Sequence, residues 1–392
     1  MHVLQVTPYF PPTWAYGGIP RIVYGLGRAL CEQGVQVTVL TTDAMDARSR
    51  APVKPDRTLD GMRVLTCRNI SNRLAYDHQL FLPQDIHALL QRVPRPDIVH
   101  LHGHRHLLNN AADRFARAQF VPTVLTANGT LLRHERKQRV KLLWDMLVSG
   151  RIPGRAARCV VVSQAEWRQH LQGGLPPERL VEIPNGLDLG EFYPLPPRGL
   201  FRRRLGIEPG RPMVVYLGQL SPRKGVEHLV TAFNHDSPAG AALVVGGNDM
   251  GGGKLARAVA DPNAPVHFVG LLEGEERIQL LVDADVLVYP STAEVFGLVP
   301  FEGLLSGTPA VVGDDCGCGE LIHGAGAGLL VRHGDVASLR AKISQLIEDS
   351  AQANAMVERG RDYIRQHFAW PRVAQQHRAM YEQVLAEAGD SL

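Results

Sequence analysis

The sequence predicts an α/β protein built from two doubly wound, Rossmann-like domains in tandem that face a cleft. Three observations support this fold class. Short apolar runs alternate with amphipathic helical patterns, the alternation stops in a proline-rich stretch and then restarts, and 392 residues suit two domains of ordinary size. Apolar runs of this kind are typical of strands buried on both faces of a parallel sheet.

The first half of the chain alternates strand-like and helical patterns. A helix is expected from Ile19 to Gln33, because its apolar residues recur on one face and Gly34 stops it. Loops are expected after the strands, including roughly residues 43–60 and 103–110, and loops of that kind are where function varies. Strands are expected at Val3–Val6, Val35–Leu40, Ile98–Leu101, Val121–Leu125, Cys159–Val162 and Leu180–Ile183.

A change of composition separates the two domains. Six prolines fall between Pro184 and Pro212, beside a basic patch, and this stretch is interpreted as a linker. The first domain is expected to cover residues 1–192, with a last helix over 370–392 packed back on it. The second is expected to cover 193–369, with strands at Met213–Leu217, Ala242–Val245, Val266–Val269, Val286–Tyr289, Ala310–Val312 and Gly328–Val331.

Composition narrows the class of protein. The formal net charge of +3, from 42 basic and 39 acidic residues, gives no reason to expect nucleic acid as a partner. Five scattered cysteines form no disulfide framework, which favours a reducing, cytoplasmic location. The first residues read as a strand rather than a signal peptide, and no apolar run reaches the roughly 18 residues that a spanning helix needs.

The segment with the most candidate binding residues follows the apolar run Val286–Tyr289. Glu294 and Glu302 are separated by seven residues, and Gly297 between them allows a close turn before a helix that begins near Leu298. Free amides at that helix start would suit a phosphate, and each carboxylate would accept hydrogen bonds from a polyol. The alternative is an ordinary helix opened by acidic residues that suit its dipole.

A second polar segment follows the run Met213–Leu217. It places Arg223 and Lys224 between Gly218 and Gly225 at the start of a helix. Two cations there suit a diphosphate and would stabilise charge on a leaving nucleoside diphosphate. A solvated turn with incidental basic residues is the alternative, and it is weaker because both segments follow strands of one domain.

With these motifs the chain resembles the retaining glycosyltransferases of family 4, glycosyl transferases group 1, which have the two-domain GT-B architecture. The resemblance is most specific between residues 213 and 331. It rests on Gly218…Arg223-Lys224-Gly225, Glu294…Phe296-Gly297-Leu298…Glu302, Gly307-Thr308-Pro309, Gly319-Glu320, Tyr16-Gly17-Gly18 and Ile183–Asp188.

The resemblance implies a role for each matching residue. Arg223 and Lys224 would hold the donor diphosphate, Glu294 would contact the transferred sugar, and Glu302 would bind the ribose hydroxyls. Arg223, Lys224 and Glu294 would thus be the catalytic residues. It also implies retention of configuration, no metal or other cofactor, and a front-face reaction in which the leaving phosphate helps to deprotonate the acceptor. Further donor contacts would come from Gly17, Gly18, Gly218, Phe296, Gly297, Leu298 and Val299.

One position departs from the family pattern. Members often carry His-Gly where this chain has Asn128-Gly129. Asparagine does not titrate, so we expect Asn128 to position a sugar or the backbone rather than to transfer a proton.

Four alternating histidines stand at the end of a predicted strand: His100, His102, His104 and His106. On one face of a strand they would offer metal ligands. The favoured interpretation is instead that His102 and His104 contact sugar or acceptor.

Three other signals have ordinary interpretations. Asp283-Ala284-Asp285 has the spacing of a metal-binding pair, but a polar junction is expected. Cys316-Gly317-Cys318 is interpreted as small residues in a turn. The basic run Arg133–Lys141, with Trp144 and Met146–Val148 after it, suits either a solvated helix face with core residues or a surface for anionic lipids.

We therefore expect a hexose to pass from a UDP-, GDP- or ADP-sugar to a hydroxyl of a glycan or lipid-linked acceptor, in cell-surface polysaccharide synthesis. A peripheral contact with the inner membrane face is left open. The alternatives are a phosphorylase or epimerase on the same scaffold, and a non-catalytic sugar-nucleotide sensor. A dehydrogenase is not favoured, because Val6-Thr7-Pro8 is not followed by a compact Gly-x-Gly-x-x-Gly turn.

Overall fold

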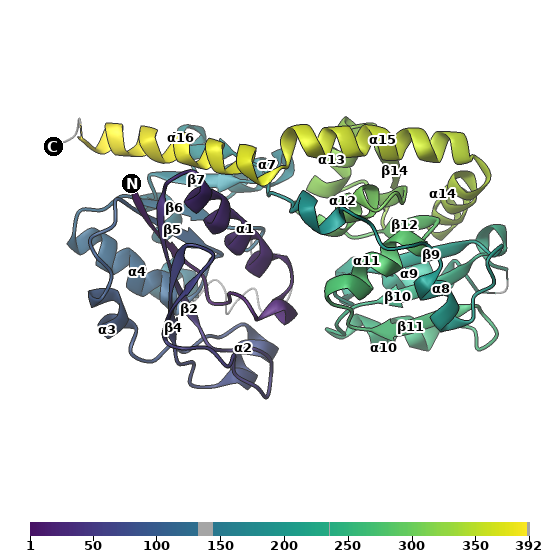
Figure 1. The fold of residues 1–392 in the computed structure, drawn as a ribbon, viewed down its shortest axis with the longest axis horizontal. Helices are drawn as coiled ribbons and strands as arrows, with labels where there is room; N and C mark the ends of the chain where they lie inside the picture. The colour runs from purple at the N-terminus through teal and green to yellow at the C-terminus, as the bar shows by residue number, and fades with distance from the viewer. Residues whose placement is uncertain (132–143, 235, 390–392) are drawn as a thin grey trace. The chain divides into compact units, whose positions relative to one another are not determined.

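The computed structural model describes residues 1–131, 144–234 and 236–389, and the chain forms two compact units (Figure 1). Unit 1 comprises Met1–Leu187 and Phe368–Leu392, and unit 2 comprises Asp188–His367. The chain passes between the units twice, slightly before the expected boundaries after residues 192 and 369. Within the described ranges, no helix is both long and apolar enough to cross a membrane.

Unit 1 is a mainly parallel sheet in the strand order β3-β4-β2-β1-β5-β6-β7-β8. Strand order reverses between β1 and β5, so helices that follow strands on either side cover opposite faces. The strands are β1 (His2–Val6), β2 (Gln36–Thr42), β3 (Asp56–Leu59), β4 (Met62–Cys67), β5 (Ile98–His102), β6 (Thr123–Thr126), β7 (Arg158–Val161) and β8 (Leu180–Glu182). The helices are α1 (Gly18–Glu32), α2 (Asn72–His78), α3 (Ile86–Gln91), α4 (Leu107–Ala118), α6 (Ile152–Arg155), α7 (Gln164–Gln172) and α16 (Trp370–Gly389).

Two segments of unit 1 correct the loops expected at 43–60 and 103–110. Residues 56–59 form β3, which pairs antiparallel with β4 across a two-residue turn at Asp60-Gly61. Arg63 of β4 binds Asp56 of β3 at 2.9 Å. An edge strand is half solvated and carries charged residues, so it lacks the continuous apolar run that marks a buried strand. The second segment ends in the first residues of α4.

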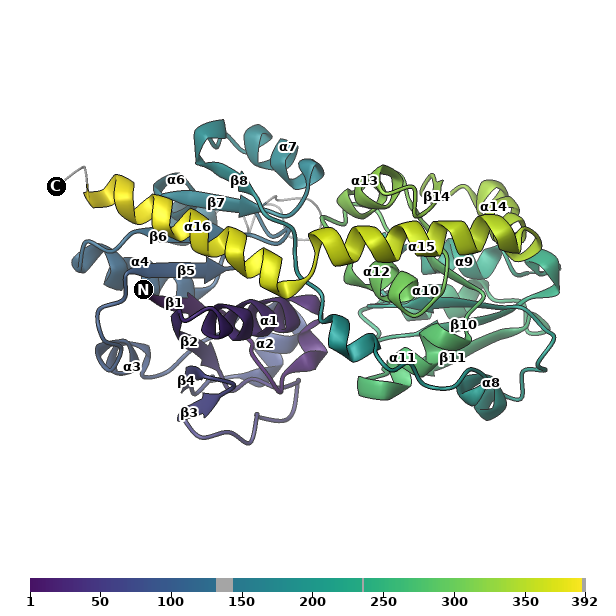
Figure 2. The same ribbon diagram turned by 45° about the horizontal axis from the view of Figure 1, so that its top comes forward.

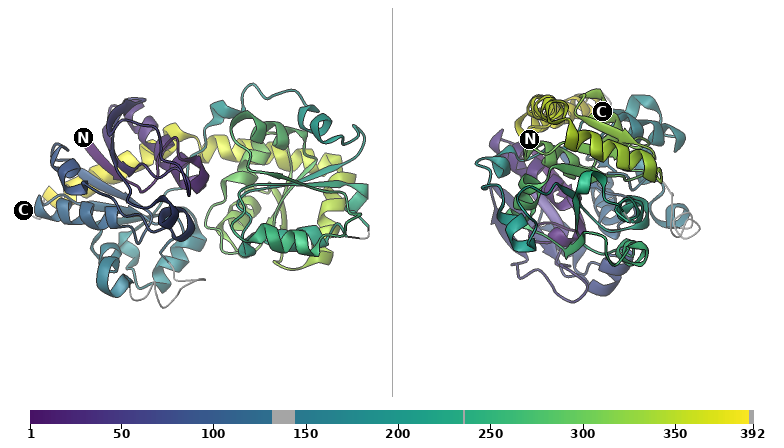
Figure 3. Two further views of the ribbon diagram at one scale, coloured as in Figure 1. Left: turned by 90° about the horizontal axis from the view of Figure 1, so that it is seen from below. Right: turned by 90° about the vertical axis from the view of Figure 1, so that its right-hand side faces the viewer.

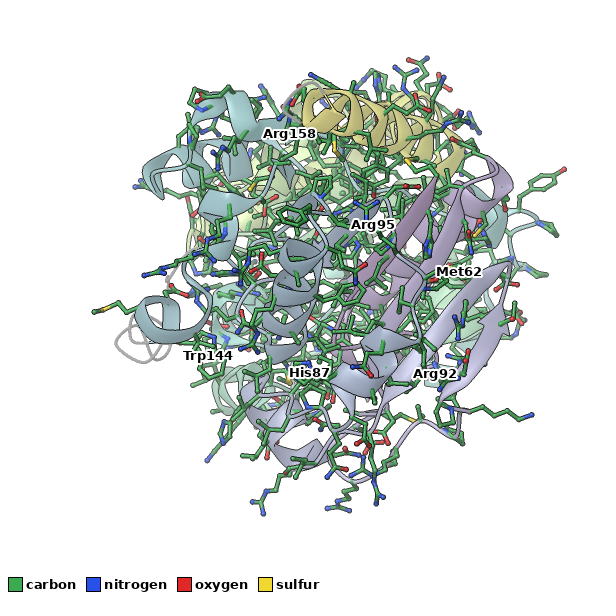
Figure 4. The ribbon with its side chains drawn as sticks, turned by 90° about the vertical axis from the view of Figure 1, so that its left-hand side faces the viewer. Met62, His87, Arg92, Arg95, Trp144 and Arg158 are labelled. Atoms are coloured by element: carbon green, nitrogen blue, oxygen red, sulfur yellow. The ribbon has the colours of Figure 1, made fainter. Side chains whose placement is uncertain are left out.

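The last helix, α16, packs on α1 of the same unit (Figure 2). A Cβ on Gly25 of α1 would approach the Trp370 ring to 2.2 Å, and a Cβ on Gly186 would approach it to 2.3 Å. Only glycine therefore fits at both positions. The Leu187 amide donates to the Phe368 carbonyl at 2.7 Å. This hydrogen bond joins the two segments of the chain that pass between unit 1 and unit 2. Near the other end, Arg158, labelled in Figure 4, binds Glu387 at 2.5 Å.

Unit 2 is a wholly parallel sheet in the order β11-β10-β9-β12-β13-β14, with helices on both faces (Figure 3, left). The order reverses between β9 and β12, which is where ligands bind in open sheets of this kind. The strands are β9 (Met213–Leu217), β10 (Ala242–Gly246), β11 (Val266–Gly270), β12 (Val286–Tyr289), β13 (Ala310–Gly313) and β14 (Gly328–Val331). The helices are α8 (Leu200–Leu205), α9 (Val226–Thr231), α10 (Gly252–Val259), α11 (Gly274–Asp283), α12 (Leu298–Leu305), α13 (Gly317–Gly324), α14 (Val336–Glu348) and α15 (Ser350–His367).

Each unit has its own apolar core. In unit 1, buried residues of β1, β5 and β6 pack against α3 and α4, with Leu4, Leu101 and Leu108 fully buried. In unit 2, Met213 and Leu287 of neighbouring strands pack on the apolar faces of α8 and α11. In unit 2, the central strands β9, β10, β12 and β13 are apolar and buried along their length, so Lys224 and Glu294 lie in loops that follow two of them.

Candidate functional site

The strand-order reversal of unit 2 brings together two of the predicted site residues. Lys224 ends a short 3-10 turn (Pro222–Lys224) after β9, and Glu294 lies in the loop after β12. Their side chains form an ion pair, with 6% of the lysine and 19% of the glutamate exposed. The two loops are also joined through the backbone, because Thr292 donates its amide to the Arg223 carbonyl at 2.9 Å. Arg223 itself is exposed.

Tyr289 completes this cluster from the end of β12. Lys224 Nζ donates to the Tyr289 hydroxyl at 2.7 Å, and that hydroxyl donates to Glu294 Oε2 at 3.1 Å. The Tyr289 ring stacks on Tyr216 of β9, with ring centroids 6.0 Å apart. Burial opposes ionisation of Glu294, but the adjacent Lys224 ammonium outweighs it and lowers the pKa of the carboxyl. The cluster is thus a fixed cation and anion side by side.

The start of α12 presents free backbone amides next to this pair. Gly297 precedes the helix with φ of 70°, and no side chain caps the helix start. A Cβ at Gly297 would approach Glu294 Cγ and the Cys318 side chain to 3.2 Å, so a larger residue would be strained there in both conformation and space. Leu298 and Val299 form the first turn. Gly218, after β9, has φ of 149°, and Phe296 is buried against Phe301, with ring centroids 5.1 Å apart.

Glu302 lies in the second turn of α12 and is nearly buried. Its Oε1 lies 2.5 Å from Nη1 of Arg277, which comes from α11. Nη2 of Arg277 lies 2.5 Å from Oε2 of Glu191, in the 3-10 turn Leu189–Phe192 that opens unit 2. Burial disfavours the charged guanidinium, yet the two carboxylates outweigh it and raise the pKa of Arg277.

The predicted donor loop of unit 1 lies between β1 and α1. Gly17 precedes α1 with φ of 92°, and Gly18 is the first residue of that helix. The loop is packed by aromatic side chains: Tyr16 stacks on Tyr9 with centroids 5.1 Å apart, and both contact Phe81.

Asn128 follows β6 in a left-handed conformation, with φ of 50°. Its side-chain amide has no hydrogen-bond partner in the part of the chain that the structure describes. The neighbouring Gly129 donates its amide to Glu166 Oε1 at 2.6 Å, and Val162 donates to Glu166 Oε2 at 2.9 Å. Burial raises the pKa of Glu166 to about 7, against the opposing effect of these two bonds. Glu166 therefore holds the loop that carries Asn128.

Of the four histidines, His100 and His102 have their rings side by side, with centroids 4.1 Å apart. His100 is bound to Tyr381 of α16 at 2.6 Å and to Thr126 at 2.7 Å. His102 lies buried and lines a cavity of about 10 Å³ with His377 and Trp370, which has room for one water molecule.

His104 and His106 take other directions. His104 Nε2 lies 3.4 Å from Asp145, and its backbone amide donates to Thr130 at 2.8 Å. His106 packs beside Phe81, with ring centroids 5.8 Å apart. Within the described ranges, no three His, Cys, Asp or Glu side chains are grouped to hold a metal ion.

The paired aspartates before β12 have a structural role, as expected for a polar junction. Asp283 accepts backbone amides at the start of α8, from Phe201 at 2.7 Å and Arg202 at 2.9 Å. Asp285 binds Arg198 and Arg202, each at 2.5 Å. Cys316 caps α13, with its sulfur 3.4 Å from the Gly319 amide.

The basic run Arg133–Lys141 lies outside the described residues. Of the apolar residues after it, Met146 is 72% exposed and Val148 is 42% exposed, in the π-helical turn Asp145–Ser149.

Sequence reasoning missed Tyr289, Arg277 and Glu166 as members of the site. Tyr289 was recognised only as the end of a strand. Arg277 had a readable signal, because it lies four residues before the buried Leu281 on the apolar face of α11. A charged residue at such a position needs a buried partner. Glu166 had no comparable signal, since its partners are backbone amides of two separate loops.

Two family models match the chain. The model described as Glycosyl transferases group 1 matches residues 198–363, and the model described as Glycosyltransferase Family 4 matches residues 16–191. Together they cover most of both units, without the first 15 residues and the last helix, α16.

Curated relatives align along most of the chain. Glycogen synthase of Mycobacterium tuberculosis is 27% identical, over 95% of this chain and 92% of that protein. D-inositol 3-phosphate glycosyltransferase of Kineococcus radiotolerans is 28% identical, over 96% of this chain and 93% of that protein. A third relative, 29% identical over 48% of this chain and 52% of that protein, comes from Corynebacterium glutamicum. It is a GDP-mannose-dependent monoacylated alpha-(1-6)-phosphatidylinositol monomannoside mannosyltransferase.

Solved structures share the fold. Sucrose-phosphate synthase from Thermosynechococcus elongatus superposes with a TM-score of 0.74 at 22% identity, covering 98% of this chain and 99% of that one. Anabaena HepE in complex with UDP-glucose gives a TM-score of 0.74 at 20% identity, covering both chains fully at 100%.

Proposed function

We propose that this chain, which belongs to family 4 of the glycosyltransferases, transfers a hexose with retention of configuration from a UDP-, GDP- or ADP-sugar. The acceptor would be a hydroxyl of a glycan or of a lipid-linked intermediate. The observation that carries the proposal is the buried ion pair of Lys224 and Glu294 where strand order reverses in unit 2. An anionic diphosphate and a polyol, joined in one donor, complement a cation and a carboxylate side by side.

The donor would be held by four groups of unit 2. Lys224 and the exposed Arg223 would bind the diphosphate, and the free amides at Leu298 and Val299 would add hydrogen bonds to it. Glu294 would accept hydrogen bonds from hydroxyls of the transferred sugar. Glu302 would do the same for the ribose hydroxyls. In unit 1, Gly17 and Gly18 would let the backbone approach the phosphates.

In the proposed reaction, the acceptor oxygen bonds to C1 of the hexose while the bond from C1 to the diphosphate oxygen breaks. The acceptor proton passes to the leaving phosphate on the same face, so no protein base is needed. Charge grows on the leaving diphosphate, and Lys224 and Arg223 would stabilise it without a metal ion. Asn128 could not replace a proton-transferring histidine, but it would orient the sugar through its amide.

The acceptor would be bound by unit 1. Asn128 has a side-chain amide available to it, and His102 and His104, which are buried, would be further contacts of the acceptor. Support for a polyol acceptor comes from the relatives, whose names include a glycogen synthase and a phosphatidylinositol monomannoside mannosyltransferase. The exposed Met146 and Val148 would suit a peripheral contact with a membrane that carries a lipid-linked acceptor.

The test is a panel of UDP-, GDP- and ADP-sugars, read by donor hydrolysis and by the shift in unfolding temperature. One donor is expected to raise the free energy of unfolding by about 2.7 kcal/mol when its concentration is 100 times its Kd. Glu294→Ala should lower turnover by roughly 10²-fold, as loss of a transition-state contact does. The proposal would be refuted if no donor is hydrolysed or raises the unfolding temperature, and if Glu294→Ala and wild type behave alike in both measurements.

The same panel separates the alternatives. Turnover that needs free phosphate would indicate a phosphorylase, and consumption of UDP-GlcNAc without acceptor would indicate an epimerase. Asn128 is the observation that favours a sensor. A sensor would be established if the protein binds a donor but transfers its sugar to no acceptor, and if Asn128→His does not restore turnover.

A further inference from the structure

A large cavity of unit 2 lies at the end of the sheet opposite the candidate site. Its volume is about 730 Å³, and its lining includes Pro212, Asp285 and Pro309, which come immediately before β9, β12 and β13. Lys224 and Glu294, by contrast, lie in the loops that follow β9 and β12. One strand length separates the two places, which is about 16 Å for a strand of the length of β9. The cavity is therefore distinct from the place proposed for the donor.

The charged lining of this cavity is mostly cationic. Asp285 is the one carboxylate among the described residues that line it. This carboxylate is 2.5 Å from Arg198 through one oxygen and 2.5 Å from Arg202 through the other, so it is shared between two cations. Two further arginines, Arg203 and Arg211, also line the cavity. The lining therefore carries an excess of positive charge.

Arg203 and Arg211 have exposed side chains, and neither forms an ion pair with a residue that the structure describes. Arg211 Nε donates to the Gly240 carbonyl at 3.1 Å, a neutral acceptor that leaves the charge uncompensated. A Cβ on Gly199 would approach Arg203 Nη1 to 3.1 Å, so this glycine lets the guanidinium lie close to the wall of the cavity. A guanidinium matches two oxygens of a phosphate group at once. Phosphate is thus the anion that these two groups suit best.

The remaining lining suits a larger molecule than a bare anion. Ile207, Leu346 and Ala353 are buried apolar residues of the wall, and Asn354 next to them in α15 is exposed. An apolar wall can cover the carbon atoms of a ligand, and a side-chain amide can bind its hydroxyls. The volume also lies within the range of about 300–1,000 Å³ that is usual for small-molecule sites.

We propose that this cavity binds a phosphate monoester of a small hydroxylated molecule. Arg203 and Arg211 bind the phosphate, and the apolar wall and Asn354 contact the rest. The inference goes beyond the proposed function and does not rest on it, because the cavity shares no residue with the proposed donor site. Asp285 also accepts the Met213 amide at 2.7 Å, so the ligand binds beside the contact that joins the starts of β9 and β12.

The experiment titrates three monoesters into the full chain by calorimetry at constant ionic strength: ribose 5-phosphate, glucose 6-phosphate and glycerol 3-phosphate. The tightest binder is compared with its unphosphorylated parent and with inorganic phosphate. We expect one molecule per chain, weaker binding of inorganic phosphate and no saturable binding of the parent. Arg203→Gln and Arg211→Gln should each weaken the ester by about 10-fold, because each removes a hydrogen bond between charged groups.

Arg204→Gln is the matched control. Arg204 is the neighbour of Arg203 on α8 and the substitution changes the charge equally, but Arg204 binds Glu276 at 2.5 Å and does not line the cavity. Its affinity for the ester should stay within about 2-fold of wild type, the size of the effect of a distant exposed charge. Asn354→Asp adds a carboxylate to the lining and should weaken the ester. Circular dichroism verifies the fold of each variant.

Arg223→Gln separates this cavity from the donor site. It should weaken nucleoside diphosphates and leave the affinity for the ester unchanged. Weakening of the ester by Arg223→Gln but not by Arg203→Gln would overturn the inference, and so would the absence of saturable binding by all three esters. Equal weakening by Arg203→Gln and Arg204→Gln would reduce the site to a general attraction of anions.

Two comparisons remain independent of each other. Equal affinity for inorganic phosphate and for the tightest ester would contradict recognition of the hydroxylated part of the ligand. Failure of UDP, GDP and ADP to bind wild type would contradict the proposed function, but it would leave a saturable ester site that depends on Arg203 in place.

Discussion

Tyr289 contributes a single hydroxyl group to the arrangement of Lys224 and Glu294. It accepts from Lys224 Nζ at 2.7 Å and donates to Glu294 at 3.1 Å. Tyr289→Phe removes this link and keeps the ring. We expect a loss of about 0.5–1.5 kcal/mol in unfolding free energy, and a drop in kcat/KM of roughly 10-fold, because the ion pair loses its fixed direction. Urea unfolding and initial rates on the preferred donor measure the two effects.

Tyr216→Phe is the control for that substitution. Tyr216 is the stacking partner of Tyr289, but its hydroxyl donates to the Gln219 carbonyl at 2.8 Å rather than to the ion pair. Its activity should stay near that of wild type. Equal loss of activity in both variants would contradict a specific role for the Tyr289 hydroxyl.

Glu166 makes a pH-dependent contribution to stability. Burial raises its folded pKa from 4.5 to about 7, so between these values the folded protein keeps a proton that the unfolded chain has released. Its contribution is therefore most favourable below pH 4.5 and is lost as pH rises to 7. At about 1.4 kcal/mol per pKa unit, the shift corresponds to roughly 3 kcal/mol.

Glu166→Gln keeps the size of the side chain and removes its titration. Between pH 5 and 7.5, the unfolding free energy of wild type should fall relative to that of the variant in urea titrations. Parallel pH curves for the two proteins would show that Glu166 does not titrate in this range.

The site residues differ in how far the sequence alone could identify them. Lys224 and Glu294 follow separate strands of one sheet, so the pattern was enough to expect them at a common edge, and the structure pairs them. Tyr289 and Arg277 carry no motif, because their importance comes from side-chain directions across neighbouring elements. The roles of Arg223 and Glu302 towards a donor stay predictions.

At the scale of elements, the strands of unit 2 lie where the apolar runs predicted them, because the four central strands are buried along their length and the edge strands β11 and β14 are still mainly apolar. The hairpin of β3 and β4 was missed because one strand lies at the sheet edge, and edge strands tolerate polar residues. Its signal was the Asp60-Gly61 pair, which is typical of two-residue turns. The apolar pattern of the sequence therefore predicts which strands are buried better than it predicts which strands pair.

The docking of α16 depends on the absence of side chains at two glycines. Gly25→Ala places a methyl group within 2.2 Å of the Trp370 ring. We expect a loss of about 1–3 kcal/mol in unfolding free energy, as overpacking of a tight contact produces. Gly154→Ala is the matched control, because nothing lies within 4 Å of that position. Guanidinium unfolding compares the two, and similar stability for both would contradict the tight contact.

At the scale of the whole molecule, the two units can be followed separately. All four tryptophans, Trp14, Trp144, Trp167 and Trp370, belong to unit 1, whereas the side chains proposed to bind the donor diphosphate and ribose lie in unit 2. A saturating nucleoside diphosphate should therefore raise the unfolding midpoint seen by circular dichroism more than the midpoint seen by tryptophan fluorescence. Identical shifts in both signals would mean that the units unfold as one.

The two passages of the chain between the units also determine an order of synthesis. Unit 2 is one continuous stretch, Asp188–His367, whereas unit 1 needs both ends of the chain. Translation runs from the N-terminus, so every residue of unit 2 leaves the ribosome before Trp370 does. Until then the surface of α1 around Gly25 is uncovered and His100 lacks its partner Tyr381. A nascent chain halted at His367 would carry a complete second unit and an unfinished first one.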